Sequence, residues 1–346
     1  FSGLGLGIIF LIVGKIIIGD LVYWLGATEE CATYSMQYAN YVLYAAPFMI
    51  GSFILNLCLR SEGSATYSMI GISFGGILNC FLDPLFIYKL GMGVAGASMA
   101  TAISKFVSFA ILLVPYIRKS SIVELSIKRI KFIVEDVKEV ISIGSSSFFR
   151  SLLTVAASIA INRVAGTYST ATLAALSVSN RVMEFPFAFI LGFGQGYQPV
   201  CSFNFGAKIY SRVKEGYFFC VRWGFIFLLG VGAICFVFAP DIVQWFRDDP
   251  EVVKVGFVAL RCQASVIFLS APIVMTNMML QSMGRGFKAS IMASARNGLF
   301  FIPLILILPH FLGLLGVQIT QTVADILTFI LTIPMAVSEF KKLNDT

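Results

Sequence analysis

Asp83 is a carboxylate inside an apolar stretch of the sequence, NCFLDP, and Asn79 precedes it by four residues. Positions i and i+4 share one face of a helix, so the amide oxygen of Asn79 and the carboxylate of Asp83 can converge on one cation. Pro84 cannot donate a backbone hydrogen bond, which leaves a carbonyl about one turn back available as a further ligand. Oxygen ligands of this kind suit Na⁺, or a proton held on the carboxylate. The alternative is structural: Asp83 bonds to a neighbouring side chain and braces two helices.

The composition places this carboxylate in a membrane protein. Of the 346 residues, 58% are hydrophobic and 12% are charged, and the mean hydropathy is +0.88. A soluble domain is about 45–50% apolar and about 25% charged, so the composition argues against a soluble enzyme, a nucleic-acid-binding protein or a disordered scaffold. His310 is the only histidine, which argues against a His-dependent metal site or catalytic triad. The seven cysteines are scattered without a CxxC pair, and we interpret them as packing residues.

Ten apolar runs are long enough to cross a bilayer, which takes about 20 mostly apolar residues in a helix. The runs are continuous and do not alternate with polar residues, so they predict helices and not the strands of a barrel. They cover residues 2–25, 38–59, 65–88, 92–117, 141–164, 171–201, 217–239, 255–282, 288–311 and 314–338. The sequence therefore predicts an all-α polytopic membrane protein.

The charges of the connecting segments alternate along the chain. Segments 118–139 and 207–216, the residues around 285–288 and the C-terminal tail carry Lys and Arg, whereas the segments near Glu29 and Asp248 are neutral or acidic. Cytoplasmic loops of membrane proteins carry the excess of Lys and Arg, so the pattern predicts that 118–139 and the C-terminus are cytoplasmic. The net charge of +7 then follows from topology, and we expect no nucleic-acid partner.

The second half of the sequence repeats features of the first half at offsets of 221 to 225 residues. Six spans separate matched elements, so both halves have the same orientation, as in a parallel transporter repeat. Two spans precede the repeated element in the second half and have no counterpart in the first, so we expect an N-terminally truncated chain with about ten of twelve helices. The matched pairs are Gly19–Trp24 with Pro240–Trp245, Ala46-Pro47 with Ala271-Pro272, Gly63 with Gly284, and Gly93-Val94 with Gly316-Val317.

Three stretches carry a resemblance to a known family: residues 59–104, 192–215 and 281–317. The first holds LDP in a span followed by GMGVAGA, and the second holds NFGAK before a basic loop. These motifs resemble the multidrug and toxic-compound extrusion (MATE) transporters, in particular their MepA-like branch, and the similarity runs along essentially the whole chain. The resemblance implies a two-lobe bundle around a central cavity, made here of helices three to twelve of the family's twelve. It also implies a cation-coupled exporter that works by alternating access.

The same resemblance implies a domain organisation and a setting. Residues 1–117 correspond to a partial N-lobe with helices three to six, and residues 136–346 correspond to the C-lobe with helices seven to twelve. Between them, we expect residues 118–135 to form a basic amphipathic linker on the cytoplasmic membrane surface. We expect a monomer in the bacterial plasma membrane that exports amphipathic, often cationic, drugs and dyes and is not an enzyme. The coupling ion is H⁺ or Na⁺, with no other cofactor.

The resemblance also implies which residues hold the coupling ion. Asn79 and Asp83 match the N-lobe cation site of MATE relatives, and Thr101 in GASMATAIS stands where the next helix contributes a Thr. Family members complete this site with an Asp on a first helix, which this chain lacks. The NorM-like branch also uses acidic residues on its seventh and tenth helices, but the matching stretches at 144–154 and 270–272 contain no carboxylate. We therefore expect coupling through the N-lobe by a proton in preference to sodium, with no metal site apart from Na⁺ at Asp83.

Further residues inside the spans have two interpretations each. Asp325 lies in an otherwise apolar last span, where it can pair with Arg296 or line the cavity and attract a cationic substrate. Met275 and Met279, with Asn277 between them, suit a promiscuous hydrophobic cavity because thioethers are flexible, but methionine also fills ordinary cores.

Arg181 and Glu184 are a separate case, because both charges fall in one span. They are three residues apart, a spacing at which opposite charges on a helix can neutralise each other, and we interpret them as such a pair.

Three alternatives to an exporter follow from the same membrane architecture. A lipid-linked oligosaccharide flippase of the same superfamily would carry more Lys and Arg within the spans to bind pyrophosphate. An integral-membrane enzyme would need convergent His, Asp or Ser side chains at one depth. A non-transporting membrane fragment would need neither additional Lys and Arg within the spans nor convergent catalytic side chains.

Overall fold

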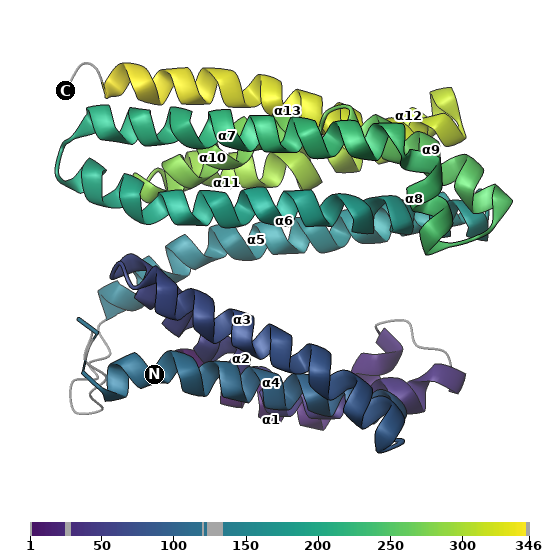
Figure 1. Ribbon diagram of the computed structural model, residues 1–346, viewed down its shortest axis with the longest axis horizontal. Coiled ribbons are helices and arrows are strands. Elements are labelled where there is room, and N and C mark those ends of the chain that lie inside the picture. Colours follow the sequence, from purple (N-terminus) through teal and green to yellow (C-terminus); the bar gives the residue numbers. More distant parts are fainter. Residues whose placement is uncertain (1, 25–28, 120, 123–133, 344–346) are drawn as a thin grey trace. The chain divides into compact units, whose positions relative to one another are not determined.

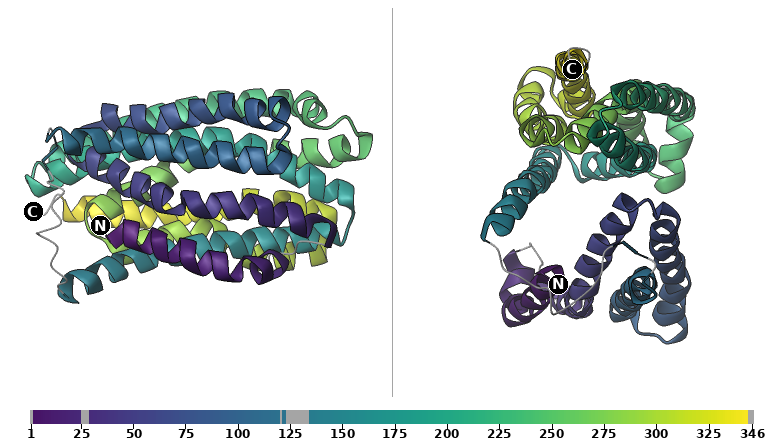
Figure 2. Two further views of the ribbon diagram at one scale, coloured as in Figure 1. Left: turned by 90° about the horizontal axis from the view of Figure 1, so that it is seen from below. Right: turned by 90° about the vertical axis from the view of Figure 1, so that its left-hand side faces the viewer.

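Long helices form because the chain must satisfy its own backbone hydrogen bonds in a bilayer, and its apolar runs do not alternate. The computed structural model describes residues 2–24, 29–119, 121–122 and 134–343, and every regular element in these ranges is a helix. The predicted all-α fold is thereby confirmed. The chain divides into two compact units, Phe1–Lys131 and Phe132–Thr346. Viewed along the helices, each unit is a bundle (Figure 2).

Unit 1 contains four long helices and one π-helical turn in its described part (purple to blue in Figure 1). Helix α2 packs against α1 and α4, and α3 packs against α4. Positions 120 and 123–133 of the predicted linker 118–135 lie outside the described residues. The elements are α1 (Ser2–Trp24), α2 (Glu29–Ser61), α3 (Ala65–Pro84), η1 (Leu85–Lys89) and α4 (Gly93–Ile117).

Two glycines about one turn apart allow α3 to approach α4 closely. A Cβ on Gly71 would lie 2.5 Å from the side chain of Leu112, and a Cβ on Gly75 would lie 2.8 Å from the Cβ of Ser108. At this contact the hydroxyl of Ser108 donates a hydrogen bond of 2.8 Å to the carbonyl of Gly71. Small residues four apart are the usual means of close helix packing in membranes. The contact holds α4 beside the part of α3 that leads to NCFLDP.

Unit 2 is built around α6, which packs against α7, α9 and α10 and runs the length of the unit (teal to yellow in Figure 1). Ser169 caps α6, because its hydroxyl accepts a hydrogen bond of 3.0 Å from the backbone N–H of Thr172. The elements are α5 (Val134–Gly166), α6 (Thr170–Gly206), α7 (Tyr210–Val237), α8 (Ala239–Phe246), α9 (Pro250–Ala264), η3 (Ile267–Leu269), α10 (Ser270–Ser282), α11 (Gly286–Ser294), η4 (Ala295–Leu299), α12 (Phe301–Leu312) and α13 (Leu314–Lys342).

Eight helical segments of the described chain are long and apolar enough to cross a membrane, and each corresponds to one predicted run. The other two predicted runs, 141–164 and 171–201, form α5 and α6, which are long helices of 33 and 37 residues. The eight segments are Gly3–Val22, Ala32–Ser61, Ala65–Lys89, Gly93–Ile117, Tyr210–Val237, Pro250–Ser282, Gly286–Leu312 and Leu314–Lys342.

Two of the predicted runs are interrupted helices. The run that ends in α10 is broken by the 3-10 turn η3, and the run that ends in α12 is broken by the π-helical turn η4. The predicted run 217–239 forms α7, which begins earlier, at Tyr210, and ends at Val237, and the short helix α8 then starts at Ala239 with Pro240 in its first turn. Proline in the first turn of a helix costs no hydrogen bond, because the N–H groups of that turn have no acceptor within the helix. Pro240 therefore favours the start of a new helix at this point.

Candidate functional site

Asn79 and Asp83 lie in the last turns of α3, and the structure brings their side chains together. The Nδ2 of Asn79 donates a hydrogen bond of 3.0 Å to Oδ1 of Asp83, and both residues are half-buried. The second carboxylate oxygen of Asp83 accepts no hydrogen bond from any described residue. The amide turns its nitrogen to the carboxylate, so the two side chains form a bonded pair and not a pair of converging oxygens.

The helix widens directly after this pair. Leu85–Lys89 form a π-helical turn, which the N–H of Leu90 closes by donating to the carbonyl of Leu85 at 3.0 Å. Pro84 has no N–H, so the carbonyl of Cys80 lacks the donor that another residue at position 84 would supply. Short π-turns inside helices occur frequently at functional sites. The segment thus offers a carboxylate oxygen and a backbone carbonyl within about one turn of each other.

Thr101 is held by its own helix. Its hydroxyl donates a hydrogen bond of 3.0 Å to the carbonyl of Ala97, and it makes no hydrogen bond to Asn79 or Asp83 within the described residues. Ser104, nearly one turn further along α4, is 1% exposed, and its hydroxyl has no hydrogen-bond partner in the described chain. Nothing in the sequence distinguishes Ser104 from Ser98 and Ser108, the other serines of this apolar helix.

In unit 2, Asp325 forms the pair with Arg296 that the sequence offered as one of two interpretations. Its carboxylate is paired with Arg296, with 2.7 Å from Nε to Oδ1 and 3.2 Å from Nη2 to Oδ2. Gln321 donates a further hydrogen bond of 2.9 Å to Oδ1, and the Arg296 guanidinium lies 4.0 Å from the ring centre of Phe187. Asp325 is 3% exposed. It is therefore an ion-pair partner and does not line an open surface of unit 2.

Met275 and Met279 do not face an open surface either. Both are fully buried in the core of unit 2, where Met275 packs close to Gly194 of α6. The expectation that they line a cavity is not met within this unit, because the face of α10 that carries them packs against α6 and α7. Asn277 lies on another face of α10 and accepts a hydrogen bond of 2.5 Å from the amide of Gln281.

The family model MatE matches residues 1–85 and 147–307, well over half of this chain. The chain belongs to the MATE family. It is therefore a multi-pass membrane protein of a transporter family. The multidrug export protein MepA of Staphylococcus saprophyticus is 26% identical over 329 residues, which cover 94% of this chain and 72% of that relative. MepA of Staphylococcus aureus strain NCTC 8325 is 29% identical over 326 residues, with the same shares covered.

Solved structures agree with this assignment. A crystal structure of MATE in complex with MaL6 superposes with a TM-score of 0.92 at 26% identity, over 100% of this chain and 78% of the other. The outward-facing conformation of a multidrug resistance MATE family transporter of the MOP superfamily gives the same TM-score, identity and coverage. The predicted MATE-type helical bundle is confirmed by these similarities.

This MATE chain has one charged cluster that sequence reasoning missed. The Glu339 carboxylate, on a residue that is 2% exposed, lies 2.5 Å from Lys288, 3.4 Å from Arg285 and 3.5 Å from Lys342. The cluster ties the start of α11 to the end of α13. The signal in the sequence is Glu339, an acidic residue that directly precedes the basic C-terminal tail.

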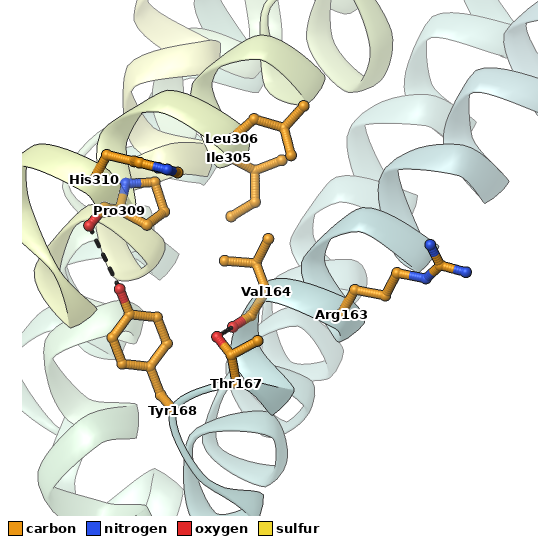
Figure 3. Close-up of a pocket in the computed structure, with 8 residues that line it drawn as sticks. All are labelled: Arg163, Val164, Thr167, Tyr168, Ile305, Leu306, Pro309 and His310. Atoms are coloured by element: carbon orange, nitrogen blue, oxygen red, sulfur yellow. Dashed lines mark hydrogen bonds between the residues drawn. The ribbon is translucent and has the colours of Figure 1, made fainter.

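A shallow cavity of about 440 Å³ lies between the ends of α5 and α12 (Figure 3). Apolar side chains line most of it, and Arg163 and His310 are its ionisable groups. The hydroxyl of Tyr168 donates to the carbonyl of Pro309 across it, at 3.5 Å. Elsewhere, the described chain contains no cluster of three or more His, Cys, Asp or Glu side chains that could hold a metal ion.

Proposed function

We propose that this chain is a proton-coupled multidrug efflux antiporter of the bacterial plasma membrane, which exports amphipathic, often cationic, compounds by alternating access. The named activity of the MepA relatives supports export of drugs. Asp83 supports the coupling, because a carboxylate within the span Ala65–Lys89 is costly to keep in a membrane and is by default a functional group.

The geometry around Asp83 suits a proton better than Na⁺. One carboxylate oxygen accepts a hydrogen bond from the Asn79 amide nitrogen, and the other oxygen has no partner in the described chain, so it can take up a proton with no rearrangement. Na⁺ would need Asn79 to present its oxygen and Thr101 to leave its bond to Ala97. Asn79, Asp83 and Thr101 remain the proposed coupling residues, with Thr101 needed only for the sodium alternative.

Coupling requires that Asp83 binds its proton with different affinity in the two access states, since a ligand with equal affinity for both states shifts nothing. The widened turn after Pro84 supplies an element that can change shape: protonation removes the charge of the carboxylate and weakens its bond from the Asn79 amide. We propose that the helix then closes or bends at this turn, which changes the affinity for the substrate.

The proposed setting follows the same assignment. Residues 1–117 would form the N-lobe and 136–346 the C-lobe, with the linker 118–135 and the C-terminus in the cytoplasm. The basic residues at the ends of α10 and α13 support this orientation. We propose that the protein works as a monomer, with small amphipathic drugs and dyes as its substrates and no cofactor beyond the coupling ion.

The test is transport of ethidium by the purified chain in proteoliposomes under an imposed pH gradient or an imposed Na⁺ gradient. We expect the pH gradient to drive ethidium movement, and Asp83→Asn to lower that rate by about tenfold or more. The matched control is Asp241→Asn, at an exposed carboxylate of the short helix α8.

Equal rates for Asp83→Asn and the unaltered chain under both gradients would refute the coupling assignment. Movement driven only by the Na⁺ gradient would make sodium the coupling ion. No gradient-driven ethidium movement by the unaltered chain would refute the exporter itself.

A further inference from the structure

The charged residues in the helices of unit 2 differ in how far their charges are balanced. Arg181 and Glu184 on α6 are both exposed, and neither makes an ion pair or hydrogen bond with any described residue. The pairing expected from their spacing of three is thus wrong for the described chain, because spacing does not fix the rotamers that bring two charges into contact. Arg296 and Asp325 balance each other one to one. The carboxylate of Glu339, by contrast, has several cations.

The group of side chains around Glu339 carries more positive than negative charge. Arg285, Lys288 and Lys342 lie 3.4, 2.5 and 3.5 Å from its carboxylate oxygens. One carboxylate among three cations leaves two positive charges that no acid of this group balances. Lys341 is exposed and adds a further positive charge beside Lys342. These four basic residues, the basic cluster, can therefore bind an anion in addition to Glu339.

Glu339 orders part of the basic cluster and leaves its outer side open. The carboxylate belongs to a residue that is 2% exposed, whereas the side chains of the three cations bonded to it are 32–55% exposed. The cations are thus held at one point from the inside, and their outer surfaces are accessible. Long side chains that are already ordered lose less conformational entropy when they bind a ligand. The cluster is therefore partly preorganised for an anion that approaches from outside the bundle.

The basic cluster lies at the boundary of the membrane. The span Gly286–Leu312 begins beside it, and the span Leu314–Lys342 ends in it. The bond from Lys288 to Glu339 joins these two span ends, so both lie at the same side of the bundle. The headgroups of phospholipids lie directly outside the hydrocarbon core, at the level where membrane spans end. The anion closest to the basic cluster in a bilayer is therefore the phosphate of a lipid.

An exposed apolar strip on α13 leads from the membrane interior to this cluster. Its members follow each other at spacings of four, three and four and are 37–56% exposed: Ile326, Ile330, Ile333 and Val337. Lys341 continues the strip at the next spacing of four, so the strip ends in the basic cluster. Figure 1 shows α13 along an edge of unit 2. Apolar side chains that are open on the surface of a membrane bundle suit the acyl chains of lipid.

We propose that the basic cluster of Arg285, Lys288, Lys341 and Lys342 binds the phosphate of an anionic phospholipid, whose acyl chain lies along the apolar strip of α13. Charge and apolar surface meet at Lys341, which is the arrangement of a phospholipid and not of a free phosphate ion. Basic pockets between transmembrane helices on the cytoplasmic side bind such headgroups. In the proposed orientation, the lipid belongs to the cytoplasmic leaflet. The site goes beyond the proposed export activity, because the lipid is a bound partner of unit 2 and not a substrate.

The test is native mass spectrometry of the purified chain in detergent, titrated with phosphatidylglycerol or with phosphatidylcholine, which has a phosphate but no net charge. We expect the unaltered chain to bind phosphatidylglycerol about tenfold more tightly or better. Arg285→Gln and Lys342→Gln should each weaken its binding by about fivefold, and together by about twentyfold. Glu339→Gln should strengthen it by about threefold, because glutamine retains an acceptor for Lys288 but no longer competes as an anion. None of these changes should alter binding of phosphatidylcholine.

Lys254→Gln is the matched control, since Lys254 is an exposed cation near the start of the span Pro250–Ser282 and the basic cluster lies past the end of that span. It should bind both lipids as the unaltered chain does. Equal affinity for the two lipids, or full affinity for phosphatidylglycerol after both cations are replaced, would overturn the inference. Loss of phosphatidylglycerol binding in Glu339→Gln would make the cluster structural and would also overturn it. Displacement of the lipid by millimolar glycerol 1-phosphate would show a site for soluble phosphate instead. None of these outcomes depends on transport, so they are separate from failure of the exporter proposal.

Discussion

The Arg296–Asp325 pair allows a quantitative prediction about stability. Asp325→Ala removes three hydrogen bonds to the carboxylate, of 2.7 and 3.2 Å from Arg296 and of 2.9 Å from Gln321, and leaves a guanidinium whose side chain is only 17% exposed. Removing one partner of a buried ion pair costs about 3–5 kcal/mol, because the remaining charge is uncompensated. The ring of Phe187, 4.0 Å away, still compensates part of that charge. We therefore expect a loss of about 3 kcal/mol in the free energy of unfolding of unit 2.

A loss of about 3 kcal/mol corresponds to a fall in Tm of roughly 6–12 °C for a domain of about 200 residues. The assay is thermal unfolding in detergent, followed by intrinsic fluorescence. Replacement of both partners by apolar residues, Arg296→Met with Asp325→Leu, should recover at least half of the loss, since no buried charge remains. Gln321→Ala should cost only about 1 kcal/mol, the value of one hydrogen bond.

Two results would refute this reasoning. One is a double variant no more stable than Asp325→Ala, which would mean that the charge of Arg296 is not the source of the cost. The other is a fully stable Asp325→Ala variant that has lost ethidium transport. That result would favour the other interpretation of Asp325, in which its carboxylate attracts the substrate.

Two further predictions concern packing and charge. Gly75→Leu should separate α3 from α4 and lower Tm, because even a Cβ at this position would lie 2.8 Å from Ser108. Gly76→Leu is the matched control and should retain the Tm of the unaltered chain, because a Cβ on Gly76 would have nothing within 4 Å. Glu339→Gln should lower Tm less than Asp325→Ala does, because its three cations are 32–55% exposed and partly screened by solvent. The effect of Glu339→Gln should shrink in high salt. The control Glu215→Gln, at an exposed glutamate near the start of α7, should show no such salt dependence.

Helical periodicity made part of the site predictable. The contact between Asn79 and Asp83 follows from their spacing of four, because both residues lie on one helix and share one face of it. The ion pair of Arg296 and Asp325 joins residues on two elements 29 positions apart. No local pattern fixes that distance, so the sequence could offer the pair only as one of two alternatives.

The sequence alone could not show whether the methionines of α10 are buried in a core or line a cavity. Met275 and Met279 have the same flexible apolar side chains in either environment, and only the packing of α6 and α7 against this helix buries them. The π-turn η4 contains a tertiary contact that no local pattern predicts, because a Cβ on Gly298 would lie 2.7 Å from the side chain of Leu153 on α5. The turn η1 follows directly after Pro84, which can be read from the sequence and supplies no N–H to the helix.

The carboxylates within the helices differ in what holds them, and this difference favours Asp83 over Asp325 as the group that exchanges a proton. Asp325 has a cation that is covalently part of the chain, so no ion from solution can replace it without first displacing Arg296. Asp83 has only an amide donor and one free oxygen, so a proton can bind and leave. A proton at Asp83 is therefore the simplest ion for the proposed coupling, because its binding displaces no charged group of the chain.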